Sequence, residues 1–230
     1  MTEAISNRLE VNGIDVRYGA SMVLQAADLL IPGGGIHLLI GRNGAGKSSL
    51  LRAMAGLQVV QRGAIILNGS DVHAMSSAER AQSLAFVAST PPRTSQLRVV
   101  EVLNLAASNA EHVSEVLAQY GDLAWAQQRM DALSDGQAQR VMFARAVLQG
   151  TPWIFMDEPT AFLDVPSRRV FWTRAVEVAR QGTTLVLATH DYEQLAGELQ
   201  PSSVHLIEAK NIVALDPRES PSQWTERMEC

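Results

Sequence analysis

The sequence predicts an α/β domain built on a parallel sheet, with an antiparallel β subdomain and a small helical subdomain attached to it. Short apolar runs at 36–40, 152–156 and 183–188 have the length of buried strands. Helical patterns separate them, one beginning at Lys47 and another opened by Pro166 near its first turn. Strands that alternate with helices in this way are typical of a parallel sheet.

Two further segments depart from this alternation. Residues 9–18 are strand-like, and the dipeptide Asn68-Gly69 follows an apolar run at 65–67. An Asn-Gly pair in this position is the strongest short hairpin signal. The stretch at about 98–132 instead shows helical periodicity without a strand-like run. We therefore expect antiparallel strands near the N-terminus and a helical subdomain at about 98–132.

These elements fit one domain, which we place at residues 1–230. We expect a loose, solvated tail at about 217–230, where a proline and several charges occur. The composition is 47% hydrophobic and 19% charged, as in ordered globular proteins. The single cysteine, Cys230, has no partner for a disulfide, and this fits a reducing compartment.

The charge balance and the hydropathy pattern limit the classes of partner. The net charge of -5 argues against nucleic acid, because phosphate backbones are bound mainly by lysine and arginine. No apolar run approaches the roughly 20 residues of a membrane-spanning helix, and residues 1–10 lack the layout of a secretory signal. We expect any connection to a membrane to come through a partner protein.

A glycine-rich segment between the strand at 36–40 and the next helix matches the pattern G-x-x-x-x-G-K-[ST] completely. Glycines allow the tight path in which backbone N–H groups converge on phosphates, and the helix adds the positive end of its dipole. Lys47 is expected to pair with the outer phosphates of ATP, and Ser48 to bind Mg²⁺. A chance turn before a core helix is the alternative, which the full match in this context disfavours. The expected ATP-binding residues of this P-loop are Gly41, Arg42, Asn43, Gly44, Ala45, Gly46, Lys47, Ser48 and Ser49.

A second motif consists of an apolar strand at 153–156 that ends in two carboxylates, Asp157 and Glu158. Ligands of open parallel sheets bind at this edge of the strands. Asp157 is suited to hold Mg²⁺. Glu158 faces a different direction in the strand alternation, so it is suited to polarise the water that attacks the γ-phosphate. The pattern is weak alone and becomes specific beside a P-loop.

A third motif, the segment 133–137 with the sequence LSDGQ, precedes a helix that runs to Gly150. Ser134 is placed as the N-cap of this helix, with Asp135 favourable in the first turn. A serine and a glycine at a helix start also form an anion site. The residues alone leave both interpretations open.

The order of these motifs, followed by AFLD at 161–164 and THD at 189–191, resembles the ATPase subunits of ABC transporters over about 9–216. The resemblance implies that the LSDGQ segment, the signature of the family, completes the ATP site of a second copy of the chain. Each chain then supplies two incomplete half-sites. The signature residues that would touch the partner's ATP are Ser134, Asp135, Gly136 and Gln137.

The resemblance implies roles for three further residues. Tyr18 stands where the family stacks an aromatic ring on adenine, and His190 where a histidine contacts the γ-phosphate and the attacking water. Asp164 is implied to lie at the dimer contact beside the hydrolytic site. Taken alone, Tyr18 could be a half-buried aromatic at a strand end, and an isolated His190 would more often be structural. With Glu158 and Lys47, His190 completes the expected catalytic set.

The chain departs from the family pattern at two positions. Asp135 stands where glycine is common, which places a carboxylate near a triphosphate unless its side chain points away. Ser89 occupies the family's glutamine position, just after a predicted strand at 84–87. A hydroxyl can contact Mg²⁺ or its water shell, but it reaches less far than glutamine. Ser89 is therefore a metal-site candidate, and the alternative is an ordinary loop residue.

The resemblance implies an ATP hydrolase that uses ATP and Mg²⁺ and acts as a dimer of two copies. Because the chain has one P-loop and no apolar span, transport would need integral membrane permease subunits and a substrate-binding protein. The chain itself would lie in the cytoplasm, peripheral on the inner face of the membrane. The motif sequences are similar to those of importers of iron-siderophores, haem and cobalamin.

The sequence fits two other classes of function less well. A soluble ABC-type ATPase that acts on ribosomes or nucleic acid usually has two P-loops, long insertions or a basic surface, and this chain has one P-loop and a net charge of -5. A regulatory nucleotide-binding module without turnover is disfavoured because Glu158 and His190 are both present.

Overall fold

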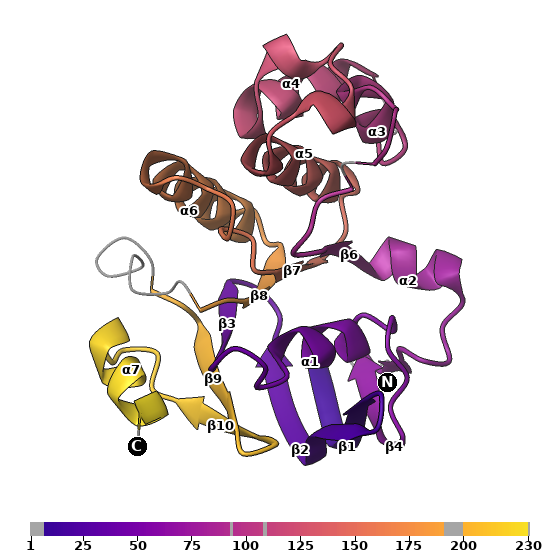
Figure 1. Ribbon diagram of the computed structural model, residues 1–230. Helices are drawn as coiled ribbons and strands as arrows, with labels where there is room; N and C mark the ends of the chain where they lie inside the picture. Colours follow the sequence, from indigo (N-terminus) through magenta and orange to yellow (C-terminus); the bar gives the residue numbers. More distant parts are fainter. Residues whose placement is uncertain (1–6, 93, 108–109, 191–199, 230) are drawn as a thin grey trace.

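Two β-sheets and a group of helices form the computed structural model, which describes residues 7–92, 94–107, 110–190 and 200–229. Figure 1 shows the sheets in the lower and central part of the view and helices α3 (Val99–Asn104), α4 (Ala110–Tyr120) and α5 (Asp135–Leu148) above them. The larger sheet has six strands in the order β10-β9-β3-β8-β7-β6. Its strands are β3 (Ile36–Ile40), β6 (Leu84–Val87), β7 (Trp153–Asp157), β8 (Thr184–Ala188), β9 (Ser203–Glu208) and β10 (Asn211–Leu215).

The larger sheet is parallel except at β10, which pairs antiparallel with β9. Every residue of β3, β7 and β8 is buried, as expected for strands covered on both faces. One core cluster joins this sheet to α5 and α6 (Val165–Arg180), and a second joins it to α1 (Lys47–Met54) and the smaller sheet. Because the strands are parallel, the segments that follow β3, β6, β7 and β8 meet at one edge. The predicted α/β architecture is confirmed.

The smaller sheet is antiparallel, with the order β2-β1-β4-β5. The predicted hairpin lies between β4 and β5, where Asn68 and Gly69 have φ values of 52° and 85°. These two left-handed residues suit the type of turn that matches the twist of the strands. The strands are β1 (Arg8–Tyr18), β2 (Ser21–Pro32), β4 (Arg62–Leu67) and β5 (Ser70–Asp71).

Helices α1, α5 and α6 begin where the sequence signals predict. Asp164 caps the helix in which Pro166 occupies the first turn, and Ser76 with Glu79 forms a capping box. None of the helices in the described ranges has the length and apolarity to cross a bilayer. The α-helices are α1 (Lys47–Met54), α2 (Ser77–Ser83), α3 (Val99–Asn104), α4 (Ala110–Tyr120), α5 (Asp135–Leu148), α6 (Val165–Arg180) and α7 (Pro221–Glu229).

A helical insertion occupies the chain between β6 and α5. It consists of α3, α4 and two 3₁₀ turns, Leu123–Trp125 and Met130–Ala132, and a bridge between Arg98 and Arg129 closes it. Arg140 of α5 lies 4.9 Å from the centre of the Trp125 ring and donates a hydrogen bond of 2.8 Å to the carbonyl of Gly121. These contacts attach α5 to the insertion.

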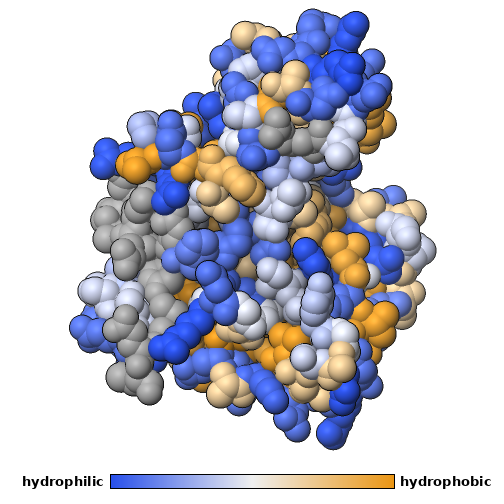
Figure 2. Space-filling view, viewed as in Figure 1, coloured by the Kyte–Doolittle hydropathy of each residue, from blue (hydrophilic) through white to orange (hydrophobic). Residues whose placement is uncertain are grey.

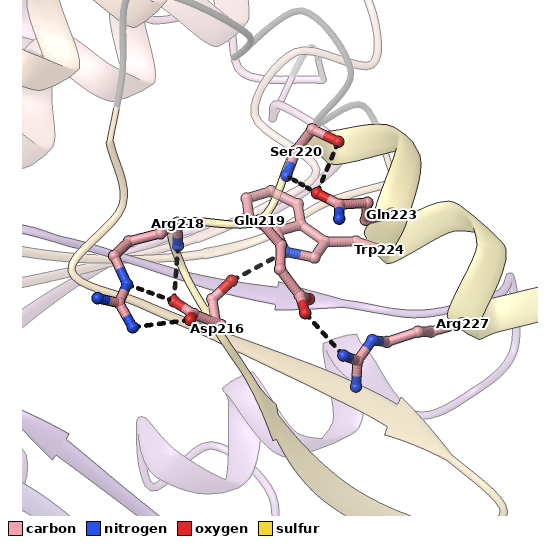
Figure 3. A network of polar contacts seen from close by, with 7 residues as sticks. All are labelled: Asp216, Arg218, Glu219, Ser220, Gln223, Trp224 and Arg227. Atoms are coloured by element: carbon pink, nitrogen blue, oxygen red, sulfur yellow. Dashed lines mark hydrogen bonds and ion pairs between the residues drawn. The ribbon is translucent and has the colours of Figure 1, made fainter.

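The C-terminal segment corrects an expectation. We predicted a loose tail at about 217–230, but Pro221–Glu229 form α7, and Trp224 is only 2% exposed. Figure 3 shows the contacts that hold this segment: Trp224 Nε1 donates to the carbonyl of Asp216 at 3.1 Å, and the Gln223 side chain accepts from the backbone N–H of Ser220 at 2.7 Å. A serine followed by a proline, as at Ser220 and Pro221, is a sequence signal for a helix start. The buried indole of Trp224 holds the segment in place.

A buried polar chain links β3 to β9. His37 Nε2 lies 2.8 Å from the carbonyl of Gly34, which can only accept, so this nitrogen carries the proton. His37 Nδ1 then accepts from the hydroxyl of Ser203, and Ser203 Oγ accepts from His205 Nε2, both at 2.8 Å. Burial lowers the pKa of both histidines, and lowers that of His205 to about 4 with a further contribution from His37. The neutral form of each ring therefore fits this site.

The low pKa of His205 makes stability depend on pH. Its folded pKa of about 4 is below the ordinary value of 6.5, so the unfolded chain binds the extra proton and stability falls as pH drops from 6.5 through 4. We expect the free energy of unfolding in urea to be about 2 kcal/mol lower at pH 5 than at pH 7. His205→Gln should remove most of this difference, whereas His112→Gln, at an exposed histidine, should keep it. The same loss in both variants would contradict the assignment.

Candidate active site

The P-loop wraps around the ammonium group of Lys47 at the end of β3. Lys47 Nζ donates to the carbonyls of Gly41 at 2.9 Å and Arg42 at 3.4 Å, and the residue is 5% exposed. Gly46 has φ 112°, and a Cβ atom there would lie 2.4 Å from Val23 Cγ1, so only glycine fits. The predicted strand, loop and helix are all present. Residues 41–46 thus form the loop that leads into α1, and Lys47, Ser48 and Ser49 begin the helix.

A second pair of side chains lies beside this loop. Ser48 Oγ donates a hydrogen bond of 2.8 Å to Asp157 Oδ1. Asp157 is fully buried, and its other oxygen, Oδ2, has no hydrogen-bond partner among the residues described. Burial raises the pKa of this carboxyl group, and the bond from Ser48 opposes that shift. A buried carboxylate oxygen without a donor is suited to a cation.

Glu158 joins three parts of the site that are distant in the sequence. Its Oε1 lies 3.6 Å from Lys47 Nζ, and its Oε2 accepts from His190 Nδ1 at 2.8 Å. The backbone of Glu158 is left-handed, with φ 46°, and its N–H donates to the carbonyl of Ala188 at 2.8 Å. A left-handed residue other than glycine costs about 1 kcal/mol. We predicted from strand alternation that Glu158 faces a different direction from Asp157. The direction of Glu158 is instead set by this left-handed backbone, because β7 ends at Asp157.

The signature segment lies elsewhere in the same chain. Ser134 is the N-cap of α5: its hydroxyl accepts from the backbone N–H of Gln137, whose side chain accepts from the N–H of Ser134 at 2.9 Å. A Cβ atom on Gly136 would lie 2.8 Å from the carbonyl of Phe162, so this glycine permits close packing. Figure 1 shows α5 well apart from α1. The structure therefore brings Lys47, Ser48, Asp157, Glu158 and His190 together, but not the signature.

The remaining predicted residues lie around this centre. Tyr18 ends β1 with 70% of its surface exposed, and Ser89 is half-buried in the loop after β6. Asp164 caps α6 through a hydrogen bond of 2.9 Å from the N–H of Ser167, a role that was not predicted from the sequence. Asp135, the departure from the family pattern, lies in the first turn of α5. Asp191, named in the THD segment, is outside the residues that the structure describes.

Comparison with known proteins identifies the family of this chain. The family model described as ABC transporter matches residues 24–161. The achromobactin transport ATP-binding protein of Dickeya dadantii is 34% identical over 187 residues, covering 76% of this chain and 70% of that protein. The iron(3+)-hydroxamate import ATP-binding protein of Bacillus subtilis is 31% identical over 203 residues, covering 83% and 76%.

Solved structures agree with these sequence matches. The structure of an ATP binding subunit of an ABC transporter superposes with a TM-score of 0.82 at 26% identity, covering 96% of this chain and 99% of that one. A dimeric, post-hydrolysis ATP-binding cassette bound to ADP and phosphate has the same fold, with a TM-score of 0.80, 21% identity and coverage of 92% and 99%. The chain belongs to the ABC transporter family, as one of its ATP-hydrolysing subunits.

Proposed function

We propose that this chain hydrolyses ATP at a site centred on Glu158 and thereby powers an importer. The observation that carries the proposal is the position of the Glu158 carboxylate, between Lys47 Nζ at 3.6 Å and His190 Nδ1 at 2.8 Å. In this place Glu158 can orient a water molecule and accept its proton, while His190 holds the carboxylate in position. Lys47 and the amides of the P-loop neutralise the charge that develops on the phosphates.

Ser48 and Asp157 are the proposed Mg²⁺ residues. One oxygen of Asp157 has no hydrogen-bond partner among the described residues, and the pKa of this carboxyl group is raised; both features fit a divalent cation, which would favour the ionised form. When bound with ATP, the cation would supply charge neutralisation on the phosphate oxygens. Ser89 stays a proposed metal-site residue because it follows β6 at the same edge of the sheet.

A second copy of the chain is the proposed partner that completes each ATP site. Ser134 and Gly136 lie at the start of α5, whose N–H groups and dipole suit a phosphate. Two apolar residues near this helix start, Phe162 and Val165, are 44% and 55% exposed. Figure 2 shows apolar surface over α6, which Val165 begins. Such surface beside Asp164 fits a contact between copies. Tyr18 is exposed enough to stack on adenine.

The proposed cargo is an iron chelate, haem or cobalamin. Relatives carry such descriptions: besides the two transport proteins above, a hemin import ATP-binding protein of Rhodococcus jostii is 32% identical over 193 residues, covering 80% of this chain and 66% of that protein. The proposed partners are integral membrane permease subunits and a substrate-binding protein, with the chain on the cytoplasmic face of the membrane.

A transporter reconstituted from these subunits should import an iron chelate, haem or cobalamin only when ATP is present. Failure to import any of the three would contradict the proposed cargo.

Lys47→Ala should remove detectable ATP binding at micromolar ATP, because Lys47 Nζ is the buried cation held at the centre of the loop. Equilibrium binding of a fluorescent ATP analogue measures the change. Arg180→Ala is the matched control, because Arg180 is an exposed cation in the last turn of α6 and is not part of the P-loop. Normal binding by the Lys47 variant would contradict the assignment of the phosphate site.

Glu158→Gln should lower the rate of ATP hydrolysis by about 10²-fold while ATP still binds, because the amide cannot accept a proton from water. Steady-state phosphate release and equilibrium ATP binding measure the two effects. Glu226→Gln, a carboxylate on α7, should leave both unchanged. Turnover at the wild-type rate in the Glu158 variant would remove this residue from the catalytic step.

Mixing two inactive chains tests the composite site. Ser134→Arg disables the signature and Lys47→Ala disables the P-loop, so each homodimer lacks both complete sites. A mixed dimer has one complete site, formed by the P-loop of the first chain and the signature of the second. We expect ATP hydrolysis to reappear on mixing, as measured by phosphate release over a range of mixing ratios. An inactive mixture that still forms dimers would contradict the role of Ser134 across the interface.

A further inference from the structure

Two glutamine side chains, one at each end of α5, attach this helix to β6 and to the residues on either side of that strand. Near its start, Gln139 Nε2 donates to the carbonyl of Ala88 at 3.2 Å. At its end, Gln149 Nε2 donates to the carbonyls of Ala81 at 2.7 Å and Leu84 at 3.2 Å. The helix that begins with the signature is therefore fixed lengthwise along one strand of the catalytic sheet.

The bond made by Gln139 lies at the edge of the sheet where the ATP site is. Ala88 follows β6 directly and precedes Ser89. The end of β6 is paired with the end of β7, where Val87 lies opposite Met156, the residue before Asp157. On the helix, Gln139 is little more than one turn beyond the N-cap Ser134. One side chain thus connects the start of the signature helix to the strand ends of the chain's own ATP site.

The environment of Gln139 is unfavourable for a residue that only fills space. It is 3% exposed, and its Oε1 has no hydrogen-bond partner within the described part of the chain. An unpaired buried oxygen costs about 1–3 kcal/mol. A leucine would fill a similar volume without that cost. The amide is therefore explained by its bond to Ala88 rather than by packing.

We propose that Gln139 is a positioning residue that sets the location of Ser134 and Gly136 relative to the sheet, and so acts on the ATP bound by the partner copy. The inference rests on the composite site proposed above. A displacement of about 1 Å at a phosphate-binding group is enough to lower activity strongly. Gln149 anchors the other end of α5, far from the signature, so its loss should move Ser134 less.

Mixed dimers can separate an effect on the partner's ATP from a general loss of stability. All chains carry Glu158→Gln to prevent turnover, and one chain of each pair also carries Lys47→Ala, so ATP binds only to its partner. Gln139→Leu is then placed either on the Lys47→Ala chain, whose signature faces the ATP, or on the ATP-binding chain. The measured quantity is the ATP concentration that gives half-maximal dimer formation in analytical ultracentrifugation.

We expect Gln139→Leu to raise this concentration about tenfold when it is on the chain that supplies the signature, the scale of losing roughly one hydrogen bond. On the ATP-binding chain it should change the value by less than about twofold. Gln149→Leu should give the same small change in both placements. Gln139→Met, which is similar in length, should repeat the asymmetry if the leucine variant folds poorly.

Two results would overturn the inference: an equal shift in both placements, which marks Gln139 as a purely structural residue, or no shift in either. Ser134→Arg on the signature-supplying chain provides the separate test of the composite site itself. If Ser134→Arg blocks dimer formation and Gln139→Leu shows no asymmetry, only the role of Gln139 fails. If Ser134→Arg has no effect, the composite site and the role of Gln139 both fail.

Discussion

The attraction between buried Lys47 and the carboxylates at the end of β7 is the interaction on which the site depends. An ammonium group and two carboxylates lose much of their hydration here, and each would be costly alone. Lys47 faces Glu158 at 3.6 Å, and Asp157 accepts from Ser48 at 2.8 Å. The parallel sheet makes this possible because it ends all of its central strands at one edge. The charges are thus held in place by the fold itself, which is the condition for electrostatic catalysis.

The same geometry explains why the proposed ATP site is incomplete in one chain. The P-loop and Glu158 lie on the sheet, whereas Ser134 and Gly136 belong to a helix attached to the helical insertion (Figure 1). A phosphate at the proposed site beside Lys47 would therefore be enclosed by its own chain on one side only. The proposed second copy supplies the other side. Under this arrangement, ATP itself becomes part of the contact between the two copies, and binding and dimer formation are linked.

Local signals in the sequence predicted much of the fold, because those signals act over a few residues. The predicted structure is present at three of these signals: the loop and helix of the P-loop, the turn at Asn68-Gly69, and the helix capped by Ser134. The sequence did not predict the left-handed backbone of Glu158 or the burial of Trp224. The backbone conformation of Glu158 depends on its hydrogen bond to Ala188 of β8. The burial of Trp224 depends on its packing in the core cluster of the larger sheet. Both contacts join segments whose proximity no local pattern encodes.

Two sets of buried polar side chains outside the ATP site differ in whether all of their hydrogen-bonding atoms have partners. His37, Ser203 and His205 form a series of hydrogen bonds in which every donor and acceptor described above has a partner. This series therefore stabilises the pairing of β3 with β9. Gln139 uses its donor and leaves its buried acceptor unpaired within the described ranges. A satisfied network is explained by stability alone. An amide that costs stability, and that lies between a signature helix and a catalytic sheet, is better explained by the position it imposes on that helix.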